Sequence, residues 1–335
     1  MSVQPTSDSF TVLQAASSAR AAAGASAAIA AAAIAVLAPA GAALADDAAC
    51  KAVKMSDVGW TDITSTTALA NTVLTGLGYE PKIDMLSVAV TFESLKNNQV
   101  NLFLGNWMPS QTEMVDPYLK QGVELVGTNL DDAKVTLAVN REAYEAGVKD
   151  FADLQKFADK FGKSIYSIEP GSSANKNLST IIEKNEFGLG DWKLVEASEQ
   201  AMLAQVDRAT RRGEWVVFLG WAPHPMNIKY KIDYLSGGDA YFGPNYGGAT
   251  VRTLANQKWI AGCPNLQKFA KQLVFDLNTE NQMMSMILDG GMDQNAAARK
   301  WLTDNPELLT KWLDGVTTID GKPGIDAVKA SLKSS

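Results

Sequence analysis

The sequence is poor in the residues that many enzymes use for catalysis or metal binding. Its 335 residues include one histidine, His224, and two cysteines, Cys50 and Cys263. These counts argue against a metal site of cysteine and histidine ligands. The hydrolase motifs G-x-S-x-G and H-E-x-x-H and the phosphate loop G-x-x-x-x-G-K-[ST] are absent. We therefore expect no metal, no cofactor and no catalytic residue, and we expect His224, which lies between two prolines, to stabilise a loop.

Positive charge is scarce as well. The chain has 30 Lys and Arg against 37 Asp and Glu, a formal net charge of −7, and no basic cluster. Nucleic acid and anionic membrane surfaces are therefore not expected partners. An acidic protein of this kind is compatible with a small cationic ligand. The length suits two domains, and a hydrophobic share of 46% allows a sizeable core.

Residues 1–45 have the composition of a secretory signal peptide. A long Ala/Ile/Val/Leu stretch ends at Ala43-Leu44-Ala45, which is an A-x-A cleavage site. A retained membrane helix is the alternative, but Pro39 interrupts the apolar run. We expect a soluble, monomeric chain that starts near Asp46 and is exported to the periplasm.

Export also suggests how the two cysteines are used. In an oxidising compartment a lone pair of cysteines usually forms a disulfide. Closing the long loop between Cys50 and Cys263 contributes about 4–5 kcal/mol in the chain-entropy model. The bond would fasten the N-terminus of the exported chain to a segment late in the sequence.

From Lys51 onward, runs with strand character alternate with runs with helix character. VKMSDVGW, KIDMLSVAV and VNLFLGNW are predicted strands, and the first precedes a helix that Thr61 or Asp62 can cap. A second set begins near Lys134, with predicted strands KVTLAVN, KSIYSIEPG, WKLVEAS and EWVVFLGW. Such alternation predicts an α/β fold with βαβ units and a parallel sheet. The tail is predicted to be helical, because its apolar residues recur at i, i+3 and i+4.

A Cys50–Cys263 disulfide would return the late segment to the first set of elements, so the chain would cross between two lobes twice. Two crossings make a hinge that closes over a ligand. We predict a two-lobed, type II-like periplasmic-binding-protein fold with the ligand in the cleft between the lobes. The predicted parts are a signal peptide (1–45), lobe 1 (46–132 plus 246–335) and lobe 2 (133–245).

Three tryptophans recur at the ends of short apolar runs. Trp60, Trp107 and Trp221 each come directly or soon after a glycine at the carboxyl end of a predicted strand. Ligands of open α/β sheets bind beyond these ends. The face of an aromatic ring attracts cations, so three such faces predict a box for a desolvated cation. Packing in the core is the alternative role for each of them.

Several long motifs resemble choline-binding proteins of ABC importers, within the betaine/choline (ProX/OpuAC-like) solute-binding family. The motifs are SDVGWTDIT (56–64), SLKNNQVNLFLGNWMP (94–109), IEPG (168–171), EQAMLAQV (199–206), FLGWAPHPMN (218–227), FGPNYGGATV (242–251) and the C-terminal WLTDNPELLTKWL. The resemblance implies that Trp60, Trp107 and Trp221 are walls of an aromatic box. It also implies that Asp62 attracts the cation, with capping of a helix as the alternative role for Asp62.

The chain departs from the pattern of the choline-binding members at three positions. Val135 stands where they have a tyrosine of the box, Ser172 where they have an asparagine, and Ala222 where they have an acidic residue. Ser172 can still hydrogen-bond an alcohol, or it can serve only as a helix cap. We consider Tyr241, Phe242 and Tyr246 as residues that could replace the missing aromatic wall.

The sequence thus predicts a periplasmic binding protein that captures choline and hands it to an ABC permease with its ATPase. Glycine betaine, carnitine and trimethylamine N-oxide are the alternative ligands. The helix N-terminus at residues 172–174 favours the carboxylate of glycine betaine or carnitine, whereas Asp62 favours a ligand of net positive charge. An exported enzyme acting on an amine is the alternative from another class.

Overall fold

The computed structural model describes residues 46–334. The signal peptide predicted over residues 1–45 lies outside the described residues, and so do its cleavage site and the apolar run before it. Within residues 46–334, none of the helices has the length and apolar character that crossing a membrane requires.

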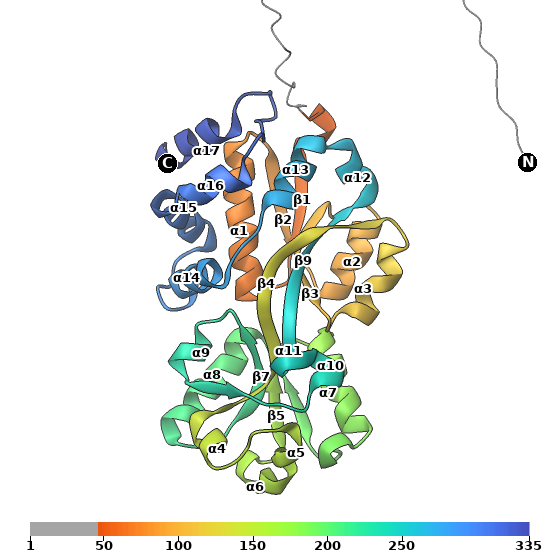
Figure 1. Ribbon diagram of the computed structural model, residues 1–335, viewed down its shortest axis with the longest axis vertical. Helices are drawn as coiled ribbons and strands as arrows, with labels where there is room; N and C mark the ends of the chain where they lie inside the picture. Colours follow the sequence, from red (N-terminus) through yellow and green to blue (C-terminus); the bar gives the residue numbers. More distant parts are fainter. Residues whose placement is uncertain (1–45, 335) are drawn as a thin grey trace, which may run out of the picture. The chain divides into compact units, whose positions relative to one another are not determined.

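Nine strands of the described chain form one sheet, and helices cover it (Figure 1). The strand order is β2-β1-β3-β9-β4-β7-β5-β6, and β8 pairs with β4. The strands are β1 (Ala52–Asp57), β2 (Glu80–Met85), β3 (Leu102–Met108), β4 (Val123–Asn140), β5 (Ser164–Ser167), β6 (Lys193–Glu196), β7 (Val217–Ala222), β8 (Ile232–Tyr234) and β9 (Gly248–Asn256).

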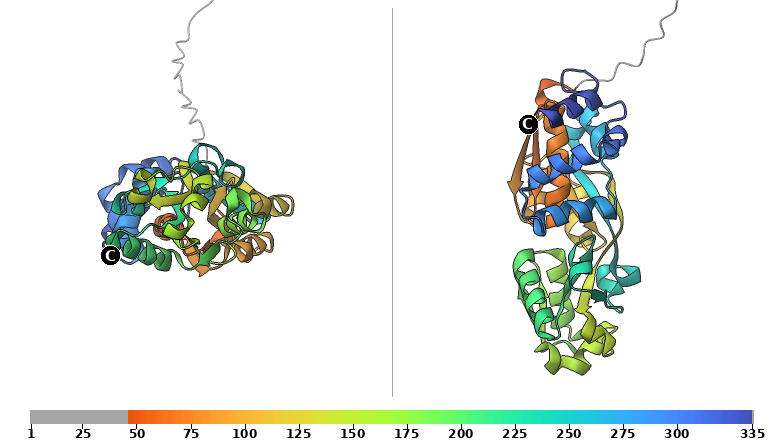
Figure 2. Two further views of the ribbon diagram at one scale, coloured as in Figure 1. Left: turned by 90° about the horizontal axis from the view of Figure 1, so that it is seen from below. Right: turned by 90° about the vertical axis from the view of Figure 1, so that its left-hand side faces the viewer.

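The helices confirm the predicted α/β alternation and the helical tail. The α-helices are α1 (Thr61–Gly76), α2 (Val88–Lys96), α3 (Thr112–Leu119), α4 (Arg141–Glu145), α5 (Phe151–Leu154), α6 (Ala158–Phe161), α7 (Ser173–Glu183), α8 (Glu199–Arg212), α9 (Met226–Lys229), α10 (Asp239–Phe242), α11 (Pro244–Gly247), α12 (Gln257–Gly262), α13 (Pro264–Gln272), α14 (Leu277–Leu288), α15 (Gln294–Asp304), α16 (Glu307–Trp312) and α17 (Gly324–Lys333). Short 3₁₀ helices are η1 (Ala48–Cys50), η2 (Gln155–Phe157) and η3 (Glu186–Gly188). Helices α14, α15 and α17 pack against α1 (Figures 1 and 2).

The sheet is mixed, so the prediction of a parallel sheet was wrong for its centre. Strand β1 pairs in parallel with β2 and β3, and β5 pairs in parallel with β6 and β7, as βαβ units require. In contrast, β9 is antiparallel to both β3 and β4, and β4 is antiparallel to β7 and β8. These pairs are antiparallel because β4 runs from the first set of elements to the second, whereas β9 runs back in the opposite direction.

Strand β4 is much longer than the predicted KVTLAVN. It spans 18 residues, of which Val123–Lys134 pair with β9 and Lys134–Val139 with β7. The segment before Lys134 contains glycine, asparagine and aspartate, which are depleted in strands. Pairing with β9 over its whole length overrides that weak local preference. The strand predicted for KIDMLSVAV is shorter instead, because Ser87 caps α2 by accepting a hydrogen bond from the Val90 N–H.

Residues with left-handed backbone lie near the two predicted crossings between lobes. Strands β4 and β9 run side by side there (Figures 1 and 2). Asp132 within β4 has a φ of 59°, and Asn245 and Tyr246 just before β9 have φ values of 57° and 62°. Left-handed backbone is unusual at residues other than glycine. These residues lie next to the boundaries expected at 132–133 and 245–246, and the division into lobes stays a prediction.

The predicted disulfide is confirmed. Cys50, at the end of η1, is bonded to Cys263, which lies between α12 and α13, and their Cα atoms are 5.8 Å apart. Both residues are buried. The bond joins the start of the described chain to the segment that follows β9, as the sequence indicated.

Candidate functional site

One cavity brings together the residues that the sequence singled out. The cavity and the open solvent at its mouth together comprise about 390 Å³ that no atom fills. Its lining includes all five predicted ligand contacts and Val135; the full set is Trp60, Asp62, Trp107, Ser110, Gln111, Val135, Ile168, Ser172, Ser173, Ala174, Leu219 and Trp221. Among these described residues there is one acid and no lysine, arginine or histidine. The cavity therefore combines large aromatic rings with a single ionisable group, which is negative when ionised.

The three tryptophans reach the cavity from the ends of strands. Trp107 and Trp221 each lie one residue before the end of a strand, β3 and β7 respectively. Trp60 follows β1 and is the N-cap residue of α1. The turn before it places Gly59 at a φ of 84°, a conformation that favours glycine. Each of the three side chains is at most 7% exposed.

Carboxylates hold two of the three indole rings. The Trp60 Nε1–H donates to both oxygens of Glu169, at 2.9 and 3.0 Å. The Trp107 Nε1–H donates to Asp62 Oδ2 at 3.1 Å. The Trp221 Nε1–H, in contrast, is buried and has no hydrogen-bond partner among the described residues. A buried donor without a partner is costly, so this N–H is an unused donor on a residue that lines the cavity.

Asp62 is the buried acid of the cavity, with 1% of its surface exposed. Its Oδ1 atom has no hydrogen-bond partner within residues 46–334. Burial raises its pKa, and the nearby Glu199 carboxylate raises it further, against the hydrogen bond from Trp107; the resulting pKa is about 8. The expectation that Thr61 or Asp62 caps α1 was wrong. The N-cap residue is Trp60, without a side-chain cap, because a carboxylate from elsewhere in the chain occupies that end of the helix.

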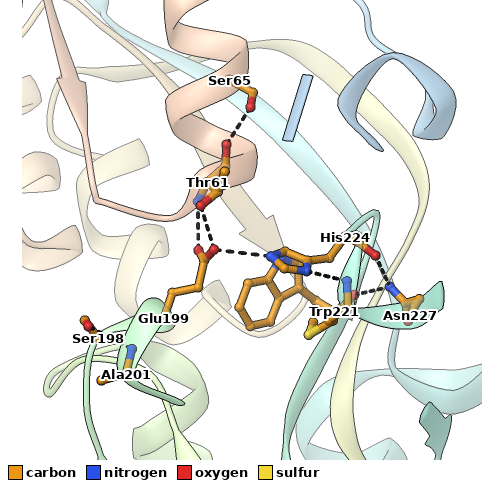
Figure 3. A network of polar contacts seen from close by, with 9 residues as sticks. Thr61, Ser65, Ser198, Glu199, Ala201, Trp221, His224 and Asn227 are labelled. Atoms are coloured by element: carbon orange, nitrogen blue, oxygen red, sulfur yellow. Dashed lines mark hydrogen bonds and ion pairs between the residues drawn. The ribbon is translucent and has the colours of Figure 1, made fainter. Parts of the chain in front are cut away.

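That carboxylate belongs to Glu199, the first residue of α8 (Figure 3). Its Oε2 accepts a hydrogen bond from the Thr61 N–H at 2.8 Å, and its Oε1 accepts one from the Thr61 hydroxyl at 2.6 Å. The Oε1 atom also lies 3.2 Å from His224 Nε2. Since His224 Nδ1 accepts from the Met226 N–H at 3.0 Å, the ring proton lies on Nε2 and is donated to Glu199.

Glu199 thereby connects two walls of the cavity. Thr61 directly follows Trp60, while the ring of His224 packs edge-on against the ring of Trp221, with centroids 4.9 Å apart. His224 lies in the loop after β7, as expected, and is buried. The network in Figure 3 therefore joins the start of α1 to the end of β7 through one buried carboxylate.

Sequence reasoning missed the site roles of Glu169 and Glu199. Glu169 lies in the turn between β5 and α7, and burial raises the pKa of its carboxyl, although its hydrogen bond from Trp60 lowers it. Glu169 lies two residues after β5, in the motif IEPG, and Glu199 is the first residue of α8, in the motif EQAMLAQV. That position was the available signal, because such ends lie at the ligand-binding edge of an α/β sheet.

Ser172 caps α7, as predicted. Its hydroxyl accepts a hydrogen bond from the Asn175 N–H at 3.2 Å, and its side chain also lines the cavity. Ser173, the first residue of α7, lies beside it in the lining. The N-terminus of an 11-residue helix therefore faces the same cavity as Asp62.

Val135 lines the cavity next to Trp221, its partner across the β4–β7 pairing. None of the three residues considered as replacement walls is among those that line the cavity. Tyr241 donates its hydroxyl to Glu186 at 2.6 Å, Phe242 packs against Phe151, and Tyr246 is 45% exposed. The described cavity is thus walled by three tryptophans and no tyrosine.

Comparisons with known proteins concern the family and the fold of the chain. Residues 51–304 match the family described as the substrate binding domain of ABC-type glycine betaine transport systems. The solved structure of an ABC-transporter choline binding protein in complex with choline has 50% sequence identity to this chain and a TM-score of 0.84. It covers 86% of this chain and 100% of its own.

Two further proteins are similar to this chain. An ABC-transporter choline binding protein in an unliganded semi-closed conformation has 50% identity and a TM-score of 0.77, over 84% of this chain and 99% of its own. The uncharacterized protein ORF1 of Chromohalobacter salexigens is 48% identical over 128 residues, which are 38% of this chain and 83% of ORF1. The matches to the family and to the solved structures confirm the predicted resemblance and the periplasmic-binding-protein fold.

The raised pKa of Asp62 predicts how stability changes with pH in the empty protein. Between the ordinary pKa of 3.8 and about 8, the folded chain holds a proton on Asp62 that the unfolded chain releases. The free energy of unfolding should therefore fall as pH rises through this range, by up to about 1.4 kcal/mol per pH unit from this group. Urea unfolding from pH 5 to 8 should show a steeper fall in the wild type than in Asp62→Asn. Parallel curves for the two proteins would refute the assignment.

Proposed function

Because the chain belongs to the family of substrate-binding domains of ABC-type glycine betaine transport systems, we propose that its cavity captures choline for an ABC importer. This family consists of transport proteins that bind a substrate without converting it. The alternative of an exported enzyme was therefore wrong.

A single observation carries the choice of a quaternary ammonium cation. Three buried indole rings and one buried acid line the same cavity, and no basic side chain of the described lining competes for them. A trimethylammonium group cannot donate a strong hydrogen bond, so it gains most from ring faces and from a nearby negative charge. Each desolvated cation–π contact contributes about 2 kcal/mol or more, and the acid adds Coulombic attraction in a poorly screened site.

The polar atoms without partners support choline among such cations. Trp221 Nε1–H is an unused donor, and Asp62 Oδ1 is an unused acceptor. A hydroxyl group offers both the acceptor that the first atom lacks and the donor that the second lacks. Ser172 and Ser173 offer further hydroxyls in the lining. We therefore assign the head group to Trp60, Trp107 and Trp221, and the alcohol end of the ligand to the polar atoms beside them.

Glycine betaine is the second candidate, and the N-terminus of α7 is the observation that favours it. Helix N-termini attract carboxylates, and Ser172 and Ser173 place this end of α7 at the cavity. An ionised Asp62 opposes the same carboxylate. Choline avoids that repulsion and remains the preferred ligand.

Closure of the two predicted lobes would trap the ligand. Glu169 and Glu199 come from the predicted lobe 2 and accept hydrogen bonds from Trp60 and Thr61 of the predicted lobe 1. An ion pair between Lys176 and the Glu113 carboxylate, at 2.8 Å, joins the same two parts. Trp60 and Trp107 of the predicted lobe 1 and Trp221 of the predicted lobe 2 would then enclose the head group. Their closure would exclude water, which strengthens the cation–π attraction.

The route to and from this site follows from the same proposal. The chain would be exported by the leader over residues 1–45, begin near Asp46 and act in the periplasm as a monomer. It would deliver choline to a membrane permease driven by an ATPase. The disulfide between Cys50 and Cys263 is consistent with an oxidising compartment.

A titration series tests the ligand. We expect choline to bind more tightly than glycine betaine, carnitine or trimethylamine N-oxide at pH 8, where about half of Asp62 is ionised in the ligand-free protein and its charge favours a net cation. Isothermal calorimetry on the purified exported chain measures all four. Tighter binding of glycine betaine at that pH would indicate that the N-terminus of α7, and not Asp62, determines which ligand is preferred.

A tryptophan variant tests the box. Trp221→Ala should weaken choline binding by about a hundredfold or more, because it removes a desolvated ring face and an N–H donor. Trp259→Ala is the matched control, since Trp259 is half-buried in α12 and does not line the cavity. Equal choline affinities of the two variants would show that Trp221 does not contribute to choline binding.

A further inference from the structure

Asp62 stands among acids that come from several elements packed around the start of α1. Glu199 of α8 raises its pKa through their charges, and Asp62 in turn raises the pKa of Glu280 on α14, which is 2% exposed. Asp57, at the end of β1, is also buried and interacts with Glu199. The start of α1 is thus surrounded by carboxyl groups on the β1, α8 and α14 sides.

Most of the hydrogen-bond donors near these carboxyl groups donate to Glu199 and Asp57 and not to Asp62. The Thr61 N–H and hydroxyl and the His224 Nε2–H all donate to Glu199. Asp57 accepts from the Gly59 N–H and the Thr64 hydroxyl. Asp62 accepts the Trp107 Nε1–H on Oδ2, and the nearby backbone N–H groups of Asp62 and Ile63 also lower its pKa, but its Oδ1 is left without a hydrogen-bond partner among the described residues.

A carboxyl group in this position has two ways to avoid an uncompensated buried charge. It can hold a proton, or it can meet a cation. The described lining of the cavity offers no basic side chain for the second way, so the cation must come from the ligand. In the ligand-free protein, Asp62 therefore avoids a buried charge by holding a proton.

We infer that choline exchanges with a proton on Asp62, and that this proton decides whether the cavity accepts a cation or a zwitterion. The inference rests on the proposed function. Ionised Asp62 attracts the trimethylammonium group, and its Oδ1 accepts the hydroxyl proton of choline. Protonated Asp62 is instead a donor, and together with the Trp221 N–H it offers two donors to the carboxylate of glycine betaine.

The two ligands should therefore respond to pH in different ways. With a pKa of about 8 for Asp62 in the empty protein, choline should release about 0.9 proton per molecule bound at pH 7. Its affinity should rise about tenfold per pH unit from pH 6 to pH 7 and level off above pH 8. Glycine betaine should release almost no proton at pH 7, and its affinity should fall above pH 8. The preference for choline over glycine betaine then increases about tenfold between pH 6 and pH 7.

Calorimetry in paired buffers measures this exchange directly. Titrations of choline and of glycine betaine at pH 7, in phosphate and in Tris, give the number of protons released from the difference in apparent binding heat. Asp62→Asn should abolish the release. Glu280→Gln is the matched control, because it removes a neighbouring buried acid that does not line the cavity. We expect Glu280→Gln to release at least half a proton with choline.

The possible outcomes distinguish failure of the proton exchange from failure of the proposed function. Choline binding with the same heat in both buffers would overturn the proton exchange and leave the proposed function standing. Proton release that persists in Asp62→Asn, or that vanishes in Glu280→Gln, would assign the proton to another group and also overturn it. If Asp62→Asn binds choline too weakly to titrate, the pH profile of the wild type and the Glu280→Gln release decide. If the wild type binds none of the quaternary ammonium compounds, the proposed function itself fails.

Discussion

A buried acid without a basic neighbour in its cavity is the constraint on which the rest of the site depends. Asp62 is almost fully buried, and the described lining supplies no positive side chain to balance its charge. A lysine or arginine in that position would neutralise the acid and would also repel a cationic ligand. Tryptophan faces attract a cation without carrying a charge of their own. The aromatic walls and the acid therefore form a cavity that favours a positively charged ligand.

The acids around the cavity also hold its walls in place. Glu169 fixes the ring of Trp60, and Glu199 ties the start of α1 to His224, which packs against Trp221. These contacts join segments of the two predicted lobes, so the geometry that binds a cation is the geometry of the closed state. Binding and closure would then stabilise one another through shared residues, as expected when a ligand selects one conformation of a hinged protein.

Local signals in the sequence revealed the walls, because each of the three tryptophans ends an apolar run that is recognisable by itself. The same signals could not reveal Glu169 and Glu199. Their partners Trp60 and Thr61 are 109 and 138 residues away in the chain, and no local pattern marks pairing over that distance. The first half of β4 was missed for a related reason, since its pairing with β9 outweighs its polar composition. The helix caps proposed for α1 failed because a distant carboxylate occupies that end.

Recognition of choline should depend on its positive charge, and one comparison measures the contribution of that charge to the affinity. The alcohol 3,3-dimethylbutan-1-ol has the shape of choline, with carbon in place of the quaternary nitrogen, and carries no charge. Calorimetric titration at pH 8 should give an affinity at least about a hundredfold weaker for this alcohol than for choline, because it loses both the cation–π and the Coulombic attraction. Equal affinities for the two compounds would show that the cavity recognises shape and apolar surface, and would contradict the account.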